Sequence, residues 1–332
     1  MTNSAARTAL VLGATGGIGG ETAAALARHG WHIRALSRKG QPADDATGWA
    51  WRQGDALDKT SVVRAAEGVQ AIVHAVNTPG YRDWDKLVLP MIDNTIEAAR
   101  ASGARVVLPG TIYNYGPDAF PLLKENSPQR ATTHKGQIRI ALEKRLEDAA
   151  RDGVRSLVVR FGDFFGPKPG NSWFSQGMVK PGAPLRSVSY PGEKGVGHAW
   201  TYLPDAGETL ARLLERDAEL EPFARFHFRG HHDADGTQMV AALRRAVGNP
   251  RLPVRPLPWF VFKLGAPFNE TMRELYAVRP LWRTPIELDN TRLGHFLGEE
   301  PHTPLDEAIM TTLVSLGCLP SSPASTALHA AH

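Results

Sequence analysis

The chain has 332 residues, of which 42% are hydrophobic and 22% charged, an ordinary composition for a globular protein with a sizeable core. Its formal net charge is only +4 and it contains no Lys/Arg tract, so we expect no nucleic-acid partner, whereas a polyanionic small ligand fits this charge. The single cysteine, Cys318, excludes a disulfide framework or a thiolate zinc cluster within one chain, which suits a reducing cytosol.

The N-terminus runs from a short polar segment, residues 1–7, into the strand-like "TALVLG" without the apolar core of a signal peptide. No window reaches the roughly 20 apolar residues of a membrane helix. The stretch "LPWFVFKLGAPF" is too short and contains prolines and a lysine. We therefore expect a cytoplasmic protein that does not enter a membrane.

Short apolar runs alternate with helical patterns over residues 8–160, which indicates a parallel sheet wrapped by helices. The apolar runs predict strands at Thr8–Leu12, His32–Leu36, Ala50–Gln53, Ala71–Ala75, Arg105–Leu108 and Ser156–Arg160. Amphipathic spacing predicts helices at Gly17–His29, Lys59–Ala66, Trp84–Ser102 and Thr133–Asp152. This order is that of an α/β protein with a doubly wound parallel sheet, the Rossmann fold.

The pattern changes after Gly162. Residues 164–192 are rich in Gly, Pro and aromatics, which predicts an irregular segment covering a ligand. Beyond it, "TYLPDAGETLARLLER" predicts a helix, "RFHFRG" a strand and Gly236–Val247 a helix. The last helix is expected to begin in "HTPLDEA", with Thr303 as its cap and Pro304 in its first turn.

These patterns predict that the chain folds into a larger domain and a smaller lobe. Residues 1–165 are expected to form a dinucleotide-binding domain, completed by about 198–230. Residues 166–197 and 231–318 are expected to form a smaller, mostly C-terminal substrate-binding lobe, and residues 319–332 a disordered tail.

Three glycines, Gly13, Gly16 and Gly19, lie between the first predicted strand and the first predicted helix. Gly13 allows a tight turn, Gly16 lets backbone amides approach a pyrophosphate, and the helix N-terminus favours negative charge. Because the glycines occur in this strand–helix context, they predict a dinucleotide-binding loop.

The end of the second predicted strand indicates which dinucleotide is bound. It reads "HIRALSRKG", with Ser37, Arg38 and Lys39 where an Asp or Glu would bind the ribose hydroxyls of NAD. A guanidinium binds a 2′-phosphate bidentately, whereas a carboxylate would repel it. We therefore expect NADP(H), with NAD(H) less favoured, and Asp55 as acceptor for the adenine amine.

The motifs "GATGGIG", "GDALD", "HAVN", "GTIYNYG" and "RFGDFFGP" follow successive predicted strands. With the later "HAWTYLPDAGETLARLLE", they resemble the extended short-chain dehydrogenase/reductase superfamily, which includes NAD-dependent epimerases and dehydratases, over roughly Thr8–Gly317. Proteins of this fold often dimerise through the helices flanking strands four and five, so the resemblance also implies a possible homodimer. It implies that the cofactor contacts Gly13, Thr15, Gly16, Gly17, Ile18, Gly19, Ser37, Arg38, Asp55, Ala56, Ala75, Val76, Asn77, Phe161 and Gly162.

In that superfamily, a Ser or Thr after strand five and a Tyr-x-x-x-Lys pair on the next helix carry the hydride chemistry. Aligning the family's Tyr-Gly pair with residues 115–116 places Thr111 at the Ser/Thr position. Aligning the next helix on Gly136 and Glu143 places Lys135 at the tyrosine and Arg139 at the lysine. Both residues of the pair are therefore replaced in this chain.

The substituted helix has a second, local resemblance. "KGQIRIALE" is similar to the lysine helix of isoflavone-reductase-like NADP-dependent reductases, in which the lysine is the proposed acid/base. An unperturbed ammonium has a pKa of about 10.4, so Lys135 is expected to donate a proton to the substrate oxygen during carbonyl reduction. Arg139 should lower the pKa of Lys135, while Glu143 and cofactor phosphates should raise it.

Arg139 is expected to hold the nicotinamide ribose, because a guanidinium does not titrate usefully. By pattern alone, however, a Lys and an Arg one turn apart also fit a solvated helix face. The hydroxyl of Tyr113 or Tyr115 is an alternative acid, although loop tyrosines often only pack.

Candidate substrate contacts flank the predicted ligand edge of the sheet, and no metal site is expected. The candidates are Tyr81, Tyr115, Asp163, Phe164, Trp173 and Trp200. The "HHDAD" run, residues 231–235, is not expected to bind a metal, because adjacent side chains in a loop rarely converge on one ion.

The sequence leaves three functions open. The first is an NADP(H)-dependent oxidoreductase of the extended type that reduces a small carbonyl or unsaturated substrate, with Lys135 in place of the usual tyrosine. The second is a dinucleotide-binding sensor or regulatory protein without redox turnover, which the loss of the Tyr-x-x-x-Lys pair favours. The third is a sugar-nucleotide epimerase or dehydratase, which needs the tyrosine base more than a reductase does.

Overall fold

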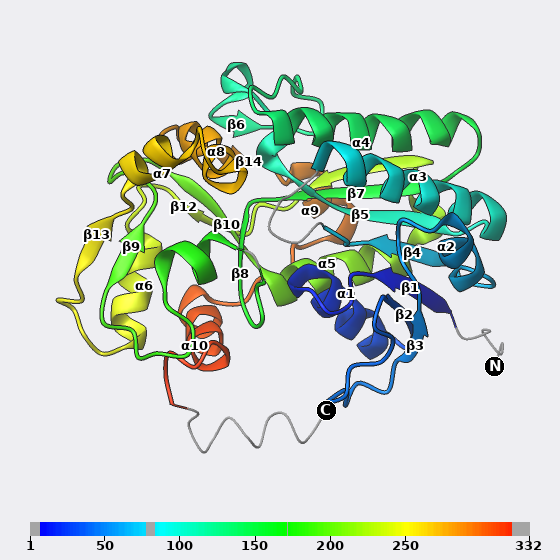
Figure 1. Cartoon of the computed structure of the whole chain (residues 1–332), viewed down its shortest axis with the longest axis horizontal. Coiled ribbons are helices and arrows are strands. Elements are labelled where there is room, and N and C mark those ends of the chain that lie inside the picture. The colour runs from blue at the N-terminus through cyan, green and yellow to red at the C-terminus, as the bar shows by residue number, and fades with distance from the viewer. Residues whose placement is uncertain (1–6, 78–83, 171, 321–332) are drawn as a thin grey trace.

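A seven-stranded parallel sheet forms the centre of the computed structural model, which describes residues 7–77, 84–170 and 172–320 (Figure 1). The strand order is β11-β7-β5-β4-β1-β2-β3, and every neighbouring pair is parallel. The order reverses between β1 and β4, so the predicted doubly wound fold is confirmed. The strands are β1 (Thr8–Leu12), β2 (His32–Ser37), β3 (Ala50–Gln53), β4 (Ala71–His74), β5 (Arg105–Thr111), β7 (Ser156–Phe161) and β11 (Phe223–His227).

Helices cover both faces of this sheet (Figure 1). Their apolar side chains form one core cluster under α1 and α5 and another under α2, α3 and α4. The helices are α1 (Gly17–Arg28), α2 (Lys59–Ala65), α3 (Trp84–Ser102), α4 (His134–Arg151) and α5 (Leu203–Glu215). Both faces of the sheet are thus buried, as its continuous apolar strands require.

The remaining elements are divided among a third core cluster beside the carboxyl ends of the central strands, a smaller fourth cluster and the first cluster. They are β6 (Leu122–Leu123), β8 (Asp163–Phe165), β9 (Val188–Tyr190), β10 (His198–Tyr202), β12 (His231–Asp233), β13 (Val254–Pro256), β14 (Glu287–Leu288), α6 (Gln238–Ala246), α7 (Trp259–Gly265), α8 (Glu270–Ala277), α9 (Thr291–Leu297) and α10 (Leu305–Ser315). Strands β8, β10 and β12 pair in one small sheet.

Several local expectations are corrected. The segment predicted to be irregular contains β8, a π-helical turn at Phe174–Met178 and β9. Thr303 does not cap α10, which begins after Pro304, because both the backbone amide and the hydroxyl of Thr303 donate to Asp205. Of the predicted tail, residues 321–332 lie outside the described residues, and Leu319 packs against the third core.

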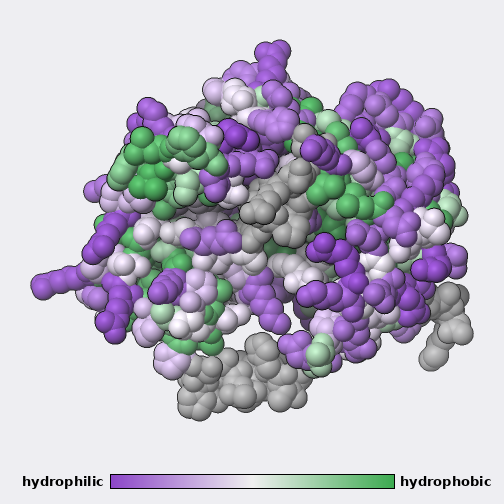
Figure 2. Space-filling view, viewed as in Figure 1, coloured by the Kyte–Doolittle hydropathy of each residue, from purple (hydrophilic) through white to green (hydrophobic). Residues whose placement is uncertain are grey.

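Helix α7 carries an exposed apolar surface (Figure 2). Phe260, Leu264 and Phe268 are 66%, 70% and 92% exposed, and none of the residues of α7 is buried. No helix in the described ranges combines the length and apolarity needed to cross a membrane.

A buried ion pair fixes α4 to the sheet. Glu143 on α4 and Arg160 on β7 are 4% and 0% exposed, and Arg160 Nη2 donates to Glu143 Oε2 at 2.6 Å. Asn114, in the turn after β5, donates to Glu143 Oε1 at 2.8 Å, and Arg160 Nη1 donates to the Tyr115 hydroxyl at 2.6 Å. The pair therefore connects the middle of α4, the turn after β5 and the end of β7.

Replacing Arg160 with Leu should lower the free energy of unfolding by about 3–5 kcal/mol, because the Glu143 carboxylate stays buried without its partner. Urea denaturation of the purified protein measures this loss. The double variant Glu143→Leu/Arg160→Leu should recover much of it, because it removes both buried charges.

The matched control is Glu193→Gln, which breaks an ion pair with Arg283 whose side chains are 52% and 49% exposed. That change should cost less than about 1 kcal/mol. An Arg160→Leu variant as stable as the control would contradict the role given to the buried pair.

Candidate functional site

A cavity of about 1390 Å³ opens at the carboxyl ends of the parallel strands. One wall is the strand ends and α4, and the other is residues 169–170 and 172–177, α7 and α8. Of the residues expected to contact the cofactor, those lining it are Gly13, Thr15, Gly16, Gly17, Ile18, Ser37, Arg38, Asp55, Ala56, Ala75, Val76, Asn77, Phe161 and Gly162. Lys135, Arg139, Thr111, Tyr113, Asp163, Phe164 and Trp173 line the same cavity.

The phosphate loop connects β1 to α1 at the floor of the cavity. Gly13 has φ +91°, and a Cβ atom there would lie 2.5 Å from the Ala75 carbonyl oxygen, so only glycine fits. Gly16, which precedes α1, offers no side-chain cap, and no acidic residue lies in the first turn. The amides at this helix start therefore suit an anionic group such as a pyrophosphate.

Gly19 does not line the cavity and supports the loop instead. A Cβ atom at Gly19 would lie 2.2 Å from the Gly13 carbonyl oxygen. The third glycine thus permits α1 to approach β1 closely, which corrects the expectation that it contacts the cofactor.

Basic side chains follow β2 at one end of the cavity. Arg38 and Lys39 are exposed, and the Lys39 backbone amide donates to the Ser37 hydroxyl at 3.3 Å. Asp55 lies after the neighbouring strand, β3, where its Oδ1 accepts from the Leu57 amide at 3.0 Å. This end of the cavity has the charge expected of a site for a phosphorylated ribose.

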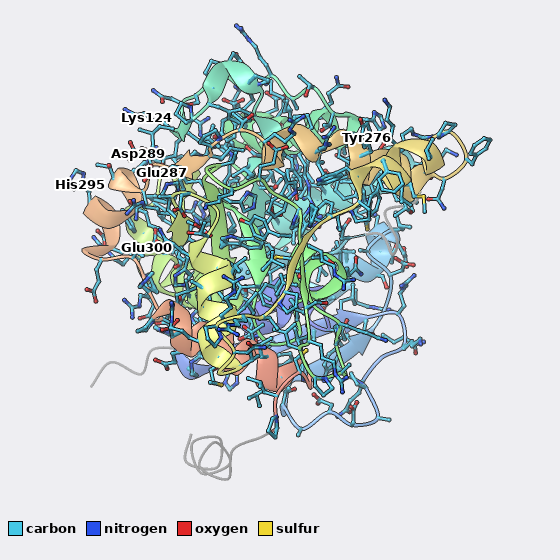
Figure 3. All side chains as sticks on the ribbon, turned by 90° about the vertical axis from the view of Figure 1, so that its left-hand side faces the viewer. Lys124, Tyr276, Glu287, Asp289, His295 and Glu300 are labelled. Atoms are coloured by element: carbon cyan, nitrogen blue, oxygen red, sulfur yellow. The ribbon has the colours of Figure 1, made fainter. Side chains whose placement is uncertain are left out.

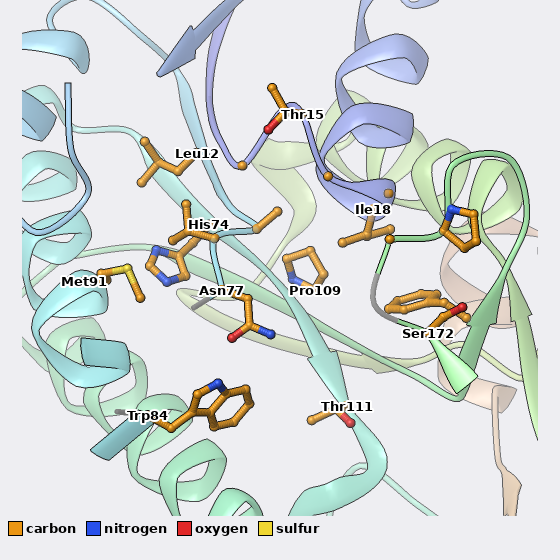
Figure 4. A pocket seen from close by; sticks show the side chains of 18 of the residues that line it. Leu12, Thr15, Ile18, His74, Asn77, Trp84, Met91, Pro109, Thr111 and Ser172 are labelled. Atoms are coloured by element: carbon orange, nitrogen blue, oxygen red, sulfur yellow. The ribbon is translucent and has the colours of Figure 1, made fainter. Parts of the chain in front are cut away.

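Thr111 ends β5 (Figure 4). Tyr113 follows it in the next turn. The Thr111 hydroxyl oxygen accepts from the Tyr113 amide at 3.3 Å, so the Thr111 proton is available to a ligand oxygen. The Tyr113 hydroxyl donates to Asp163 Oδ1 at 2.8 Å, and Asp163 Oδ2 lies 2.8 Å from His198 Nε2. The proton of Tyr113 is therefore directed at Asp163.

Lys135 lies in the first turn of α4, whose start is capped by the Thr133 hydroxyl. It is only 5% exposed, and burial lowers its pKa to about 8. Glu274 and Glu270 oppose this shift and Arg139 adds to it. The expectation that Glu143 raises the pKa of Lys135 is corrected, because the Glu143 carboxylate is bound to Arg160 instead.

Trp84 at the start of α3 was not predicted as a site residue. The Lys135 ammonium lies 5.6 Å and the Arg139 guanidinium 4.9 Å from the centre of its ring. Stacking on an aromatic face stabilises both cations. The solvated helix face allowed by the sequence pattern is thus replaced by a cavity wall.

His74 was also missed, although it belongs to the quoted "HAVN" motif. It is 3% exposed and lines the cavity, and burial lowers its pKa to about 3, with Arg139 contributing, so the ring is neutral. The Thr95 hydroxyl donates to the Met91 carbonyl, so the 2.8 Å contact to His74 requires that Nδ1 donates. Its Nε2 is then an acceptor.

Tyr115 is a structural residue and not the expected substrate contact. It is 2% exposed, burial raises its pKa, and it does not line the cavity. His227 Nδ1 lies 3.1 Å from the Leu123 carbonyl and donates to it, so the Tyr115 hydroxyl donates to His227 Nε2 at 2.8 Å.

Trp200 is likewise a core residue, fully buried against His198 and Trp282, whose rings stack on each other. Tyr81, the remaining substrate candidate, lies outside the described residues. In the "HHDAD" run, the Asp233 carboxylate accepts from the amides of residues 237–239 at the start of α6.

A second cavity, of about 420 Å³, lies on another part of the surface. Lys124, Asp289 and His295 line it, and Figure 3 shows them well away from Tyr276 on α8. None of the residues expected to contact the cofactor or the substrate, or to act in catalysis, lines it. The large cavity is therefore the candidate active site.

Known proteins with similar sequences or structures match most of the chain. A curated relative, the 3-diazoavenalumate denitrifying reductase of Streptomyces sp, is 26% identical over 307 residues, covering 85% of this chain and 90% of the relative. The UDP-N-acetylglucosamine 4-epimerase from Bacillus cereus superimposes with a TM-score of 0.69 at 14% identity, covering 96% and 99% of the two chains. MoeE5 in complex with UDP-glucose and NAD gives 0.71 at 19% identity, covering 93% and 98%.

The structural neighbours share the fold, and the sequence itself identifies the family. The model of the NAD dependent epimerase/dehydratase family matches residues 9–224, from β1 into β11. The chain belongs to the NAD dependent epimerase/dehydratase family and shares its NAD(P)-binding fold.

Proposed function

We propose that the protein is an NADP(H)-dependent reductase in which Lys135 is the proton donor to a small carbonyl or unsaturated substrate. The observation that carries this proposal is the position of Lys135, which is buried in the wall of the same cavity that Thr111 lines. The reductase activity named for the curated relative supports oxidoreduction.

The residues present suit a dinucleotide. Gly13 and Gly16 form the cradle for the pyrophosphate, the amides at the start of α1 provide its donors, and Asp55 accepts from the adenine amine. When bound, the dinucleotide supplies the hydride. Because Arg38 and Lys39 follow β2 where a carboxylate would select NAD, we infer a preference for NADP(H).

The pKa of Lys135 suits proton donation near neutral pH. With a pKa of about 8, its ammonium form makes up about nine-tenths of the population at pH 7. A donor with a pKa close to the working pH transfers its proton most effectively. The Thr111 hydroxyl donates to the same oxygen and orients it.

Tyr113 is the less suitable donor, since its hydroxyl proton is directed at Asp163. It presents oxygen lone pairs to the cavity and positions substrate. Arg139 on its Trp84 platform holds the ribose next to the nicotinamide. These roles favour reduction over oxidation, because Lys135 is mainly protonated at neutral pH.

A sugar-nucleotide epimerase is the second candidate, favoured by solved epimerase structures that match more than nine-tenths of the chain. It requires a base at the substrate hydroxyl, which a mainly protonated Lys135 provides poorly. Interconversion of UDP-glucose and UDP-galactose without net NADPH consumption would support this candidate over the reductase.

Replacing Arg38 with Ala should weaken NADPH binding by about 10–100-fold, because a charge-assisted hydrogen bond to the 2′-phosphate contributes about 1.5–3 kcal/mol. NADH binding should change by less than about threefold. Calorimetric titration of both cofactors measures this difference. Arg52→Ala is the matched control, an exposed arginine of β3 outside the cavity. Tighter binding of NADH than NADPH by the unaltered protein would refute the cofactor assignment.

Replacing Lys135 with Met should lower kcat about 100-fold or more, since general-acid catalysis is lost. In the unaltered enzyme, kcat/KM for reduction should fall as pH rises through about 8, because the ammonium form carries the proton. Turnover is measured as NADPH consumption across a panel of aldehydes, ketones, enones and nucleotide sugars.

The control for this variant is Lys144→Met, an exposed position on the same helix. Lys135→Arg should also be slow and should lose the fall in rate near pH 8, because a guanidinium does not titrate there. Unchanged turnover in Lys135→Met would exclude the lysine as proton donor. Tight NADPH binding with no turnover on any substrate would favour the sensor.

A further inference from the structure

Glu274 is a buried carboxylate that the proposed chemistry does not use. It lies on α8, lines the large cavity and is 8% exposed. Within the described part of the chain, its Oε2 atom is buried and has no hydrogen-bond partner. A buried acceptor without a donor costs free energy, so this oxygen suits a ligand that brings a donor.

Apart from Glu274, the described residues that line the cavity from α7, α8 and their flanking residues are apolar. Leu257, Phe262, Leu275 and Val278 line the cavity from α7, α8 and the residues beside them, and Trp173 completes this wall. Among the described residues that line the cavity from this side, none is Lys or Arg. The only charge on the wall is thus the negative charge of Glu274.

The cations that line the substrate half of the cavity belong to a different element, α4. Lys135 and Arg139 both lie over the Trp84 ring, beside the strand ends where the cofactor is expected. A substrate diphosphate resting on the α8 wall would meet a carboxylate and apolar side chains, where phosphate recognition needs arginine or lysine. Flat aromatic surfaces, by contrast, pack well between tryptophan and phenylalanine rings.

We infer that the substrate is a small aromatic carbonyl compound that bears a hydrogen-bond donor, a hydroxyl or an amino group, and that Glu274 accepts from this donor. The inference rests on the proposed reductase function for the identity of the reacting group. Lys135 and Thr111 then hold the carbonyl oxygen, while Glu274 holds the opposite end of the molecule and selects it over a sugar nucleotide.

The test is calorimetric titration of the protein saturated with NADP⁺, so that binding is measured without turnover. The probes are the three hydroxybenzaldehydes, the matching aminobenzaldehydes, 4-hydroxycinnamaldehyde, their methoxy and unsubstituted counterparts, and UDP-glucose. At least one hydroxyl or amino probe should bind about 10-fold or more tightly than its methoxy counterpart, as expected for a hydrogen bond to a charged group.

Glu274→Leu should abolish this preference while leaving the unsubstituted aldehydes bound as before. Glu274→Gln keeps the shape of the side chain and offers a weaker acceptor, so an intermediate preference for the hydroxyl or amino probes is expected. This variant replaces Glu274→Leu if the Leu variant does not fold. The matched control is Glu270→Gln, one turn away on the same helix and exposed, which also acts on Lys135 through its charge but does not line the cavity. It should keep the preference.

Three results would overturn the inference. They are equal binding of the hydroxyl or amino probes, the methoxy probes and the unsubstituted aldehydes; a hydroxyl or amino preference that is unchanged in Glu274→Leu; and binding of UDP-glucose that is tighter than binding of the aldehydes. A Glu274→Gln variant whose only change is a lower pH midpoint of turnover would also overturn it, because Glu274 would then act on Lys135 alone. Glu274-dependent binding with no NADPH oxidation would contradict the reductase and support the substrate class. Reduction of aldehydes without Glu274-dependent selection would support the reductase and contradict the substrate class.

Discussion

The buried Glu143–Arg160 ion pair is the constraint on which the candidate site depends. It holds α4 against β7 and, through Asn114 and Tyr115, holds the turn after β5 against both. Lys135 lies two turns before Glu143 on the same rigid helix, so its height above the sheet edge is set by this pair. Thr111 and Tyr113 gain their positions from the same network, which places the proposed donors in one cavity wall.

The fold could be predicted well from the sequence because its signals are local. Apolar runs of strand length, a glycine loop and helix caps each act over a few residues, and the central strands and helices were placed within a few residues of their ends. Most residues of the cofactor wall could also be predicted from the sequence, because in a parallel sheet the residues after successive strands meet at one edge.

The substrate half could not be predicted in the same way. Glu274 reaches the cavity from α8, and Trp84 supports Lys135 from α3, and neither belongs to a motif recognised in the sequence. Tyr115 and Trp200 were mistaken for site residues because sequence position cannot tell a cavity wall from the core behind it. Only the partners of Tyr115, His227 and Arg160, reveal its structural role.

In the proposed mechanism, Lys135 replaces the phenol because its surroundings lower the pKa of its ammonium group. Burial and the nearby Arg139 charge make the Lys135 ammonium easier to deprotonate, while Glu274 opposes this shift. The most direct test is NMR titration of the lysine side chains in isotopically labelled protein, with Lys135→Arg used to assign the resonance. Lys135 is expected to titrate near pH 8. Titration of Lys135 at about 10.4, the value of an exposed lysine, would contradict it.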